Sequence, residues 1–128
     1  MRIDIKGTQL DLTPSLKVYI EEKLSVLNRF IARFERNGER VLFFEIARAT
    51  KHHRHGNVFY AEAMVKLPGR TIRIEEYDSD ARTAVDRVKN RLKIDLKKYK
   101  EKRIARVERK KRNHSAGAAS TEILSPVE

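Results

Sequence analysis

The stretch that decides the fold runs from Ser79 to Arg112 and reads SDARTAVDRVKNRLKIDLKKYKEKRIARVERKKR. Its apolar residues recur at steps of three and four, and a helix that turns about 100° per residue places such positions in one narrow stripe. The stripe consists of Ala81, Val85, Val88, Leu92, Leu96 and Tyr99. The pattern predicts one long helix whose apolar stripe packs on a core.

Basic side chains line both sides of this stripe. One flank carries Arg82, Lys89, Lys93, Lys97 and Lys100, and the other carries Arg87, Arg91, Lys98 and Lys102. Residues 79–112 contain fifteen Lys and Arg and five Asp and Glu, a net charge of +10 in a chain of net charge +11. Asp95 and Glu101 allow only a few salt bridges at helical spacing. Such a localised basic surface is typical of nucleic-acid binding, although an anionic membrane surface would attract it too.

The rest of the chain predicts four strands and one further helix. Residues 2–6 alternate as in a strand, Thr13 and Pro14 are typical of a helix start, and Asn37 and Gly38 are typical of a helix end. Further strands are expected over residues 41–50, over residues 59–67 and after the turn at Pro68 and Gly69. The positions expected to face inward are Ile3, Ile5, Leu16, Ile20, Leu24, Leu27, Ile31, Phe34, Leu42, Phe44, Ile46, Phe59, Ala61, Ala63, Val65, Leu67, Ile72 and Ile74.

The predicted order is β-α-β-β-β-α, and it has a simple packing solution. A four-stranded sheet with one apolar face accepts both helices on that face, which gives a two-layer α+β sandwich. We expect one domain over residues 1–112, with the long helix projecting beyond the sheet. Residues 113–128 are rich in Ala, Ser, Gly and Thr and are expected to form a disordered tail.

Several functional classes find no support in the sequence. The chain has no cysteine, no apolar run long enough to span a bilayer and no apolar signal segment, so we expect a soluble cytoplasmic protein that does not bind a membrane. No catalytic motif or acid-base pair is recognisable, and we predict neither an enzyme nor a cofactor. His52, His53 and His55 invite a metal interpretation, but no further ligand completes a set, and a basic loop that contacts phosphate is favoured.

Recognition of folded RNA by its phosphates and its shape fits the basic helix best. Aromatic residues are sparse, and Phe44 and Phe59 are assigned to the core, so no base-stacking surface is evident. Glu75, Glu76 and Asp78 precede the long helix and are expected to have a structural role.

Two runs resemble one known family. Residues 11–29, DLTPSLKVYIEEKLSVLNR, and residues 80–100, DARTAVDRVKNRLKIDLKKYK, are similar to the short form of the ribosome hibernation promoting factor family, over about residues 1–103. The resemblance implies a double-stranded-RNA-binding-domain-like fold and a non-enzymatic inhibitor of translation under stress. It implies binding to rRNA of the small ribosomal subunit at the decoding channel, where the protein occludes the tRNA and mRNA sites.

The resemblance also implies rRNA-binding residues. The positions that align with basic residues of the family are Lys23, Arg29, Arg91, Lys98 and Lys102, and supporting contacts are expected from Arg87, Lys89, Lys93 and Lys97. Ile94 and Asp95 depart from the family, which often has a basic residue and Gln there. We expect that charge reversal at Arg91 and Lys98 weakens ribosome binding and leaves stability nearly unchanged.

Other interpretations stay open at this point. Long family members carry a second, dimerising domain, which is expected to be absent here because only residues 113–128 follow the helix, and we expect a monomer off the ribosome. A general structured-RNA-binding or RNA-chaperone module would use the same basic helix without a defined ribosomal site. A protein-interaction role toward a sigma factor would be insensitive to salt.

Overall fold

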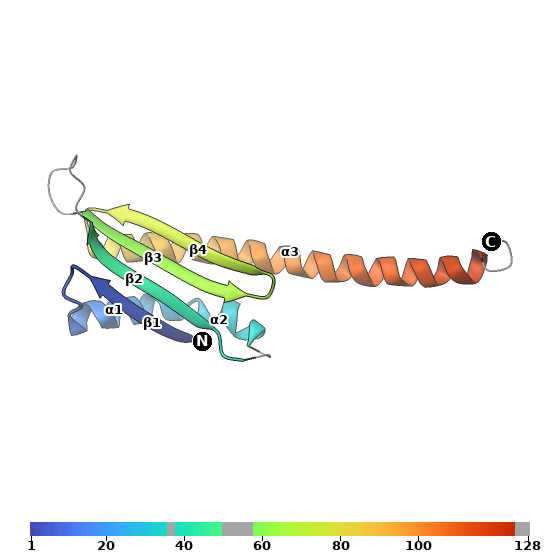
Figure 1. Ribbon diagram of the computed structural model, residues 1–128, viewed down its shortest axis with the longest axis horizontal. Coiled ribbons are helices and arrows are strands. Elements are labelled where there is room, and N and C mark those ends of the chain that lie inside the picture. Colours follow the sequence, from blue (N-terminus) through green and yellow to red (C-terminus); the bar gives the residue numbers. More distant parts are fainter. Residues whose placement is uncertain (36–37, 50–57, 125–128) are drawn as a thin grey trace. The chain divides into compact units, whose positions relative to one another are not determined.

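The computed structural model describes residues 1–35, 38–49 and 58–124, with side chains up to residue 112. Within these ranges the elements follow in the order β1 (Arg2–Thr8), α1 (Pro14–Ser25), α2 (Asn28–Ile31), the 3-10 helix η1 (Ala32–Phe34), β2 (Val41–Ala49), β3 (Val58–Leu67), β4 (Arg70–Asp78) and α3 (Ala81–Leu124) (Figure 1). The chain divides into two compact units, Met1–Leu96 and Lys97–Glu128. The predicted order β-α-β-β-β-α is confirmed.

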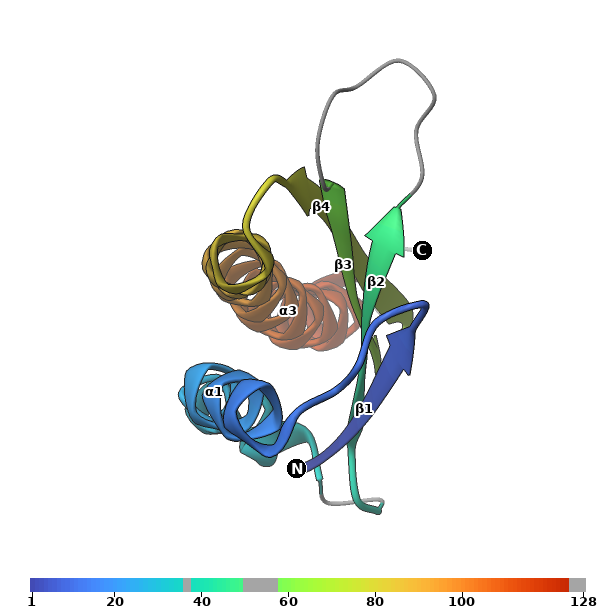
Figure 2. The same cartoon turned by 90° about the vertical axis from the view of Figure 1, so that its left-hand side faces the viewer.

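The four strands form one mixed sheet in the order β1-β2-β3-β4. β1 and β2 are parallel, and the other two pairs are antiparallel. One row of the register, Ile5, Phe44, Ala63 and Ile74, crosses all four strands. In the first unit, α1 and the part of α3 up to Leu96 cover the same face of the sheet (Figure 2). The predicted α+β sandwich with two helices on one face is therefore confirmed.

The core lies between this face and the helices. The predicted inward positions from Leu16 to Ile31 and on β2, β3 and β4 are buried, except that Phe59 on β3 is half-buried. Phe34 in η1 is also half-buried. Ile3 and Ile5 on the edge strand are half-buried as well. The stripe on α3 is buried from Val85 to Tyr99. Helical spacing in the helices and alternation in the strands thus identify the core.

The predicted first helix is interrupted. The sequence suggests one helix from Thr13 to Asn37, whereas α1 ends at Ser25 and α2 begins at Asn28. The Ser25 hydroxyl donates to the Glu22 carbonyl oxygen over 2.8 Å, so the side chain competes for an acceptor of the backbone ladder. Asn37 lies outside the described residues. The apolar spacing survives the break because both helices face the same core.

Side-chain caps fix the starts of the two long helices. The Leu16 amide donates to Thr13 Oγ1 over 3.2 Å, as predicted for α1. At α3, the Thr83 amide and hydroxyl donate to Asp80 Oδ2 over 3.0 and 2.7 Å. These bonds with Thr83 hold the pKa of Asp80 below its ordinary value of 3.8. The helix start predicted at Thr13 and Pro14 is confirmed, and Asp80 caps α3 in the same way.

The end of α3 differs from expectation. The sequence suggests that the helix ends near Arg112, whereas α3 continues to Leu124. Residues 113–124 include three alanines, which are the best helix formers, and no proline interrupts α3 before Pro126. The division into a domain over residues 1–112 and a tail over residues 113–128 stays a prediction.

Candidate nucleic-acid interface

The two flanks of α3 face different elements of the first unit. Asp86 accepts a hydrogen bond from α1, and Arg82, Lys89 and Lys93 lie four residues before it, three after it and seven after it. We call these three residues the α1-facing flank. Arg87 and Arg91 form ion pairs with β4, and we call them the β4-facing flank. The flanks are similar in sequence but not in surroundings.

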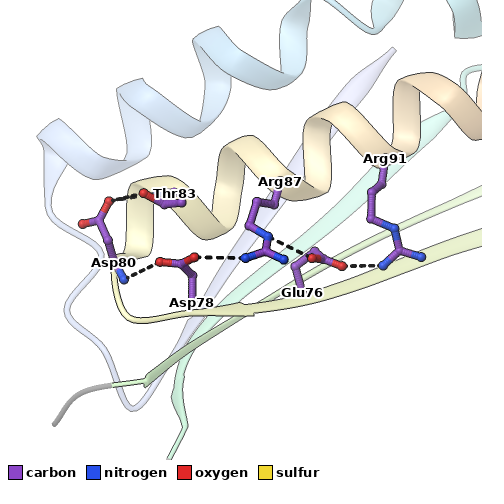
Figure 3. A network of polar contacts seen from close by, with 6 residues as sticks. All are labelled: Glu76, Asp78, Asp80, Thr83, Arg87 and Arg91. Carbon is purple, nitrogen blue, oxygen red and sulfur yellow. Dashed lines mark hydrogen bonds and ion pairs between the residues drawn. The ribbon is translucent and has the colours of Figure 1, made fainter.

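The β4-facing flank is paired with acids (Figure 3). Arg87 donates to Glu76 Oε1 over 3.1 Å and to Asp78 Oδ2 over 3.2 Å. Arg91 donates to the other oxygen of Glu76 and, over 3.1 Å, to the Glu75 carbonyl oxygen. The two acid side chains are 13% and 19% exposed, whereas both arginines are about half exposed. The expected structural role of the acidic strand end is confirmed. Its carboxylates neutralise the positive charge of the β4-facing flank.

The α1-facing flank meets α1 at a tyrosine. The Tyr19 hydroxyl donates to Asp86 Oδ1 over 2.7 Å. The guanidinium of Arg82 and the ammonium of Lys23 lie 4.9 and 5.4 Å from the centre of the Tyr19 ring, and Arg82 also donates to Ser15 Oγ over 3.0 Å. Burial and the bond to Asp86 raise the pKa of Tyr19 to about 12. Two cations from different helices are thus held on one aromatic ring.

The lysines near this cluster lack acidic partners. Among the described residues, no ion pair is formed by Lys23, Lys89 or Lys93, and all three side chains are half-buried. Their stems cover apolar surface, which leaves the ammonium groups at the protein surface. Ammonium groups without acidic partners are available to phosphate at little cost, because no ion pair has to break.

The remaining predicted residues are exposed. Arg29 on α2 holds its guanidinium 4.7 Å from the centre of the Phe30 ring. Lys97, Lys98 and Lys102 belong to the second unit, and their side chains are exposed and form no ion pair with described residues. The structure therefore brings Lys23 next to the α1-facing flank. Arg87 and Arg91 differ from that group because they are paired with acids of β4.

We call Tyr19, Asp86, Arg82 and Lys23 the tyrosine cluster. Sequence reasoning missed two residues that hold this cluster together. Tyr19 and Arg82 were not among the predicted site residues, although Tyr19 stands four residues before Lys23 on the same helix. That spacing alone would have suggested the contact within α1. The hydrogen bond from Tyr19 to Asp86 joins residues 67 positions apart, and the sequence around either residue does not predict it.

Two other predictions concern metals and membranes. No group of three or more His, Cys, Asp or Glu side chains that could hold a metal ion occurs in the described part of the chain. His52, His53 and His55 lie outside the described residues. Across those same described ranges, no helix combines the length and the apolar character needed to cross a bilayer.

Known proteins provide two close comparisons of sequence. The Ribosome hibernation promotion factor of Staphylococcus aureus (strain COL) is 27% identical over 117 residues, which cover 88% of this chain and 53% of that protein. The Ribosome hibernation promoting factor of Azotobacter vinelandii is 29% identical over 106 residues, covering 83% of this chain and 89% of that protein. The chain thus spans about half the length of the first relative and most of the second.

Solved structures resemble the chain at the level of the fold and of the sequence. The crystal structure of the N-terminal domain of Protein Y from Thermus thermophilus superposes with a TM-score of 0.60 at 31% identity, over 77% of this chain and 99% of that one. A ribosomal subunit interface protein from Coxiella burnetii superposes with a TM-score of 0.59 at 27% identity, over 79% and 99%. The model of one family, described as Sigma 54 modulation protein / S30EA ribosomal protein, matches residues 3–104. Because this match spans α1, nearly the whole sheet and α3 as far as Ile104, the chain belongs to the Sigma 54 modulation protein / S30EA ribosomal protein family.

Proposed function

We propose that this protein is a ribosome hibernation factor that inhibits translation without catalysing a reaction. It binds rRNA of the small ribosomal subunit in the decoding channel of the cytoplasmic ribosome, competes with tRNA and mRNA, and is a monomer off the ribosome. Relatives named as hibernation factors and as a ribosomal subunit interface protein support this proposal. The observation that carries it is the set of unpaired ammonium groups on the helical face of the first unit.

The paired and unpaired cations have different roles in this proposal. Lys23, Lys89 and Lys93 contact phosphate directly, because none of them has to give up an ion pair with a described acid. Arg29, Lys97, Lys98 and Lys102 extend the contact as exposed cations. Arg87 and Arg91 contact phosphate only with the part of each guanidinium that Glu76 and Asp78 leave open.

Co-sedimentation with ribosomes and isolated subunits tests the proposal. Purified protein is spun with each particle over a salt series, with and without saturating tRNA. We expect binding to the small subunit that tRNA displaces and that weakens steeply with salt, with a slope of about 0.7 to 0.9 per phosphate contact. Equal binding to any structured RNA, with no effect of tRNA, would leave only a general RNA-binding module.

A matched pair of variants locates the interface. Lys89→Glu/Lys93→Glu reverses two charges on the α1-facing flank, and Lys6→Glu/Lys66→Glu reverses two on the outer face of the sheet. We expect the first pair to lose at least about tenfold in affinity and to lower the salt slope by about 1.5. The second pair has the same net charge and is expected to retain most of the affinity. Equal losses in both pairs would contradict an interface on the helices.

A further inference from the structure

The outer face of the sheet, opposite the helices, is not covered by any described element of the first unit (Figure 2). Strand register orders its side chains in rows that cross all four strands. The three central rows are Thr8-Ala47-Tyr60-Tyr77, then Lys6-Glu45-Glu62-Glu75, then Asp4-Phe43-Met64-Arg73. A row of glutamates therefore runs between an aromatic row and a row with an apolar centre.

Large apolar side chains are exposed on this face. Phe43 is 42% exposed and Tyr77 is 39% exposed, and the rings of Tyr60 and Tyr77 lie 5.1 Å apart. Phe43 and Met64 also line a shallow depression between β1 and β3. The charged side chains of that depression are Asp4, Lys6, Glu45 and Glu62. Exposed apolar surface next to a depression is typical of a docking surface.

The depression on this face has an excess of acids, which favours a cationic occupant over an anionic one. Glu45, Glu62 and Glu75 stand directly opposite one another on neighbouring strands, an arrangement that costs stability through like-charge repulsion. Arg73 offsets part of the cost, because its Nε lies 2.7 Å from Glu62 and its Nη2 lies 2.7 Å from Glu75. Lys6 is the one cation lining the depression, against three carboxylates.

We propose that the outer sheet face docks an extended, arginine- or lysine-bearing segment of a protein partner. A guanidinium in the depression pairs with Glu45 and Glu62 while its stem lies on Phe43 and Met64. The aliphatic stem of a basic residue covers apolar surface, and its cationic head is attracted to both carboxylates and aromatic faces. This proposal is independent of the proposed function, because it concerns a different face and a different ligand chemistry.

Fluorescence anisotropy with a labelled peptide tests the proposal. The probe is a nonapeptide of alternating Arg and Ser, and the same peptide with Glu in place of Arg is the negative probe. The variant Asp4→Asn/Glu45→Gln removes two charges from the depression, and Glu21→Gln/Glu22→Gln removes two exposed charges from α1. We expect the first pair to weaken binding of the Arg peptide at least about fivefold. The second pair, with the same net charge, is expected to change binding by less than about twofold.

Nuclear magnetic resonance on the unmodified protein keeps the test independent of any variant. We expect addition of the Arg peptide to shift the amide resonances of Phe43, Glu45 and Met64 more than those of α1. No binding at millimolar peptide, equal weakening in both variant pairs, or shifts confined to the helices would each overturn the proposal. Ribosome binding by the wild-type protein is unaffected by any of these outcomes.

Discussion

Arg91 and Lys93 offer a sharp test of the difference between the two flanks of α3. They stand two residues apart on the same helix, yet Arg91 is bonded to Glu76 and to the Glu75 carbonyl oxygen, whereas Lys93 forms no ion pair with described residues. Arg91→Glu and Lys93→Glu make the same change in net charge. They should therefore differ in stability and in RNA affinity for reasons that lie in the structure alone.

The expected loss of folding stability in Arg91→Glu follows from the bonds that Arg91 makes. An exposed ion pair is worth about 0.2 to 1 kcal/mol, and Glu76 keeps Arg87 as a partner after the change. A new carboxylate about 4 Å from Glu76 adds a repulsion of about 1 kcal/mol in water. We expect Arg91→Glu to lose about 1 to 2 kcal/mol, which is a decrease in Tm of about 4 to 12 °C for a domain of this size. Lys93→Glu should stay within about 0.5 kcal/mol of the wild type.

Thermal unfolding and RNA binding of both variants, measured in the same buffer, provide the assay. We expect Lys93→Glu to show the larger loss of small-subunit affinity and Arg91→Glu the larger loss of Tm. The sequence alone suggests that reversal at Arg91 leaves stability nearly unchanged, and the pairing with Glu76 replaces that expectation. If Arg91→Glu unfolds at the wild-type temperature and loses RNA as strongly as Lys93→Glu, the assignment of the two flanks is wrong.

Three further predictions concern the core, the tyrosine cluster and a cap. Leu92→Ala should cost about 2 to 5 kcal/mol in urea unfolding because Leu92 is fully buried, whereas Ile94→Ala, 52% exposed on the same helix, should cost less than about 0.5 kcal/mol. Tyr19→Phe should cost about 1 kcal/mol through the lost bond to Asp86 and leave the salt slope of RNA binding unchanged, because both cations stay; a lower slope would contradict this. The pKa of Asp80 is lowered from 3.8, so its charge stabilises the fold above about pH 4, and that contribution is lost as the pH falls through the folded pKa. Asp80→Asn retains a capping side chain without the charge, so its free energy of urea unfolding should fall less between pH 5 and about pH 3 than that of the wild type. An equal fall in both proteins would contradict the assignment.

The fold could be predicted because its signals are local and mutually consistent. Alternation identifies the inward side of β2 and β3, and helical spacing identifies the stripe on α3. The break between α1 and α2 could not be predicted, because the apolar spacing continues across it from Leu24 to Ile31. Apolar spacing alone does not distinguish a continuous helix from two helices on one core.

The candidate site was predictable in composition but not in pairing. The basic residues of α3 are evident in the sequence, whereas the partner of each one depends on how α3 lies against β4 and α1. Glu76 pairs with Arg87 and Arg91, at separations of 11 and 15 residues, and helical spacing rules say nothing about such contacts. Counting the acids on the helix therefore overestimates the free charge of the β4-facing flank, since its acids come from the strand.

The same pairing explains why one basic helix does not make the molecule basic on all sides. Glu76 and Asp78 neutralise the flank nearest to β4, and the glutamate row on the outer sheet face continues this acidic side away from the helices. A polyanion should thus be attracted more strongly to the face that carries Lys23, Lys89 and Lys93 than to the outer sheet face, where acids match the basic residues. We therefore expect the proposed RNA ligand to bind in one orientation and to leave the outer sheet face open for the proposed cationic protein segment.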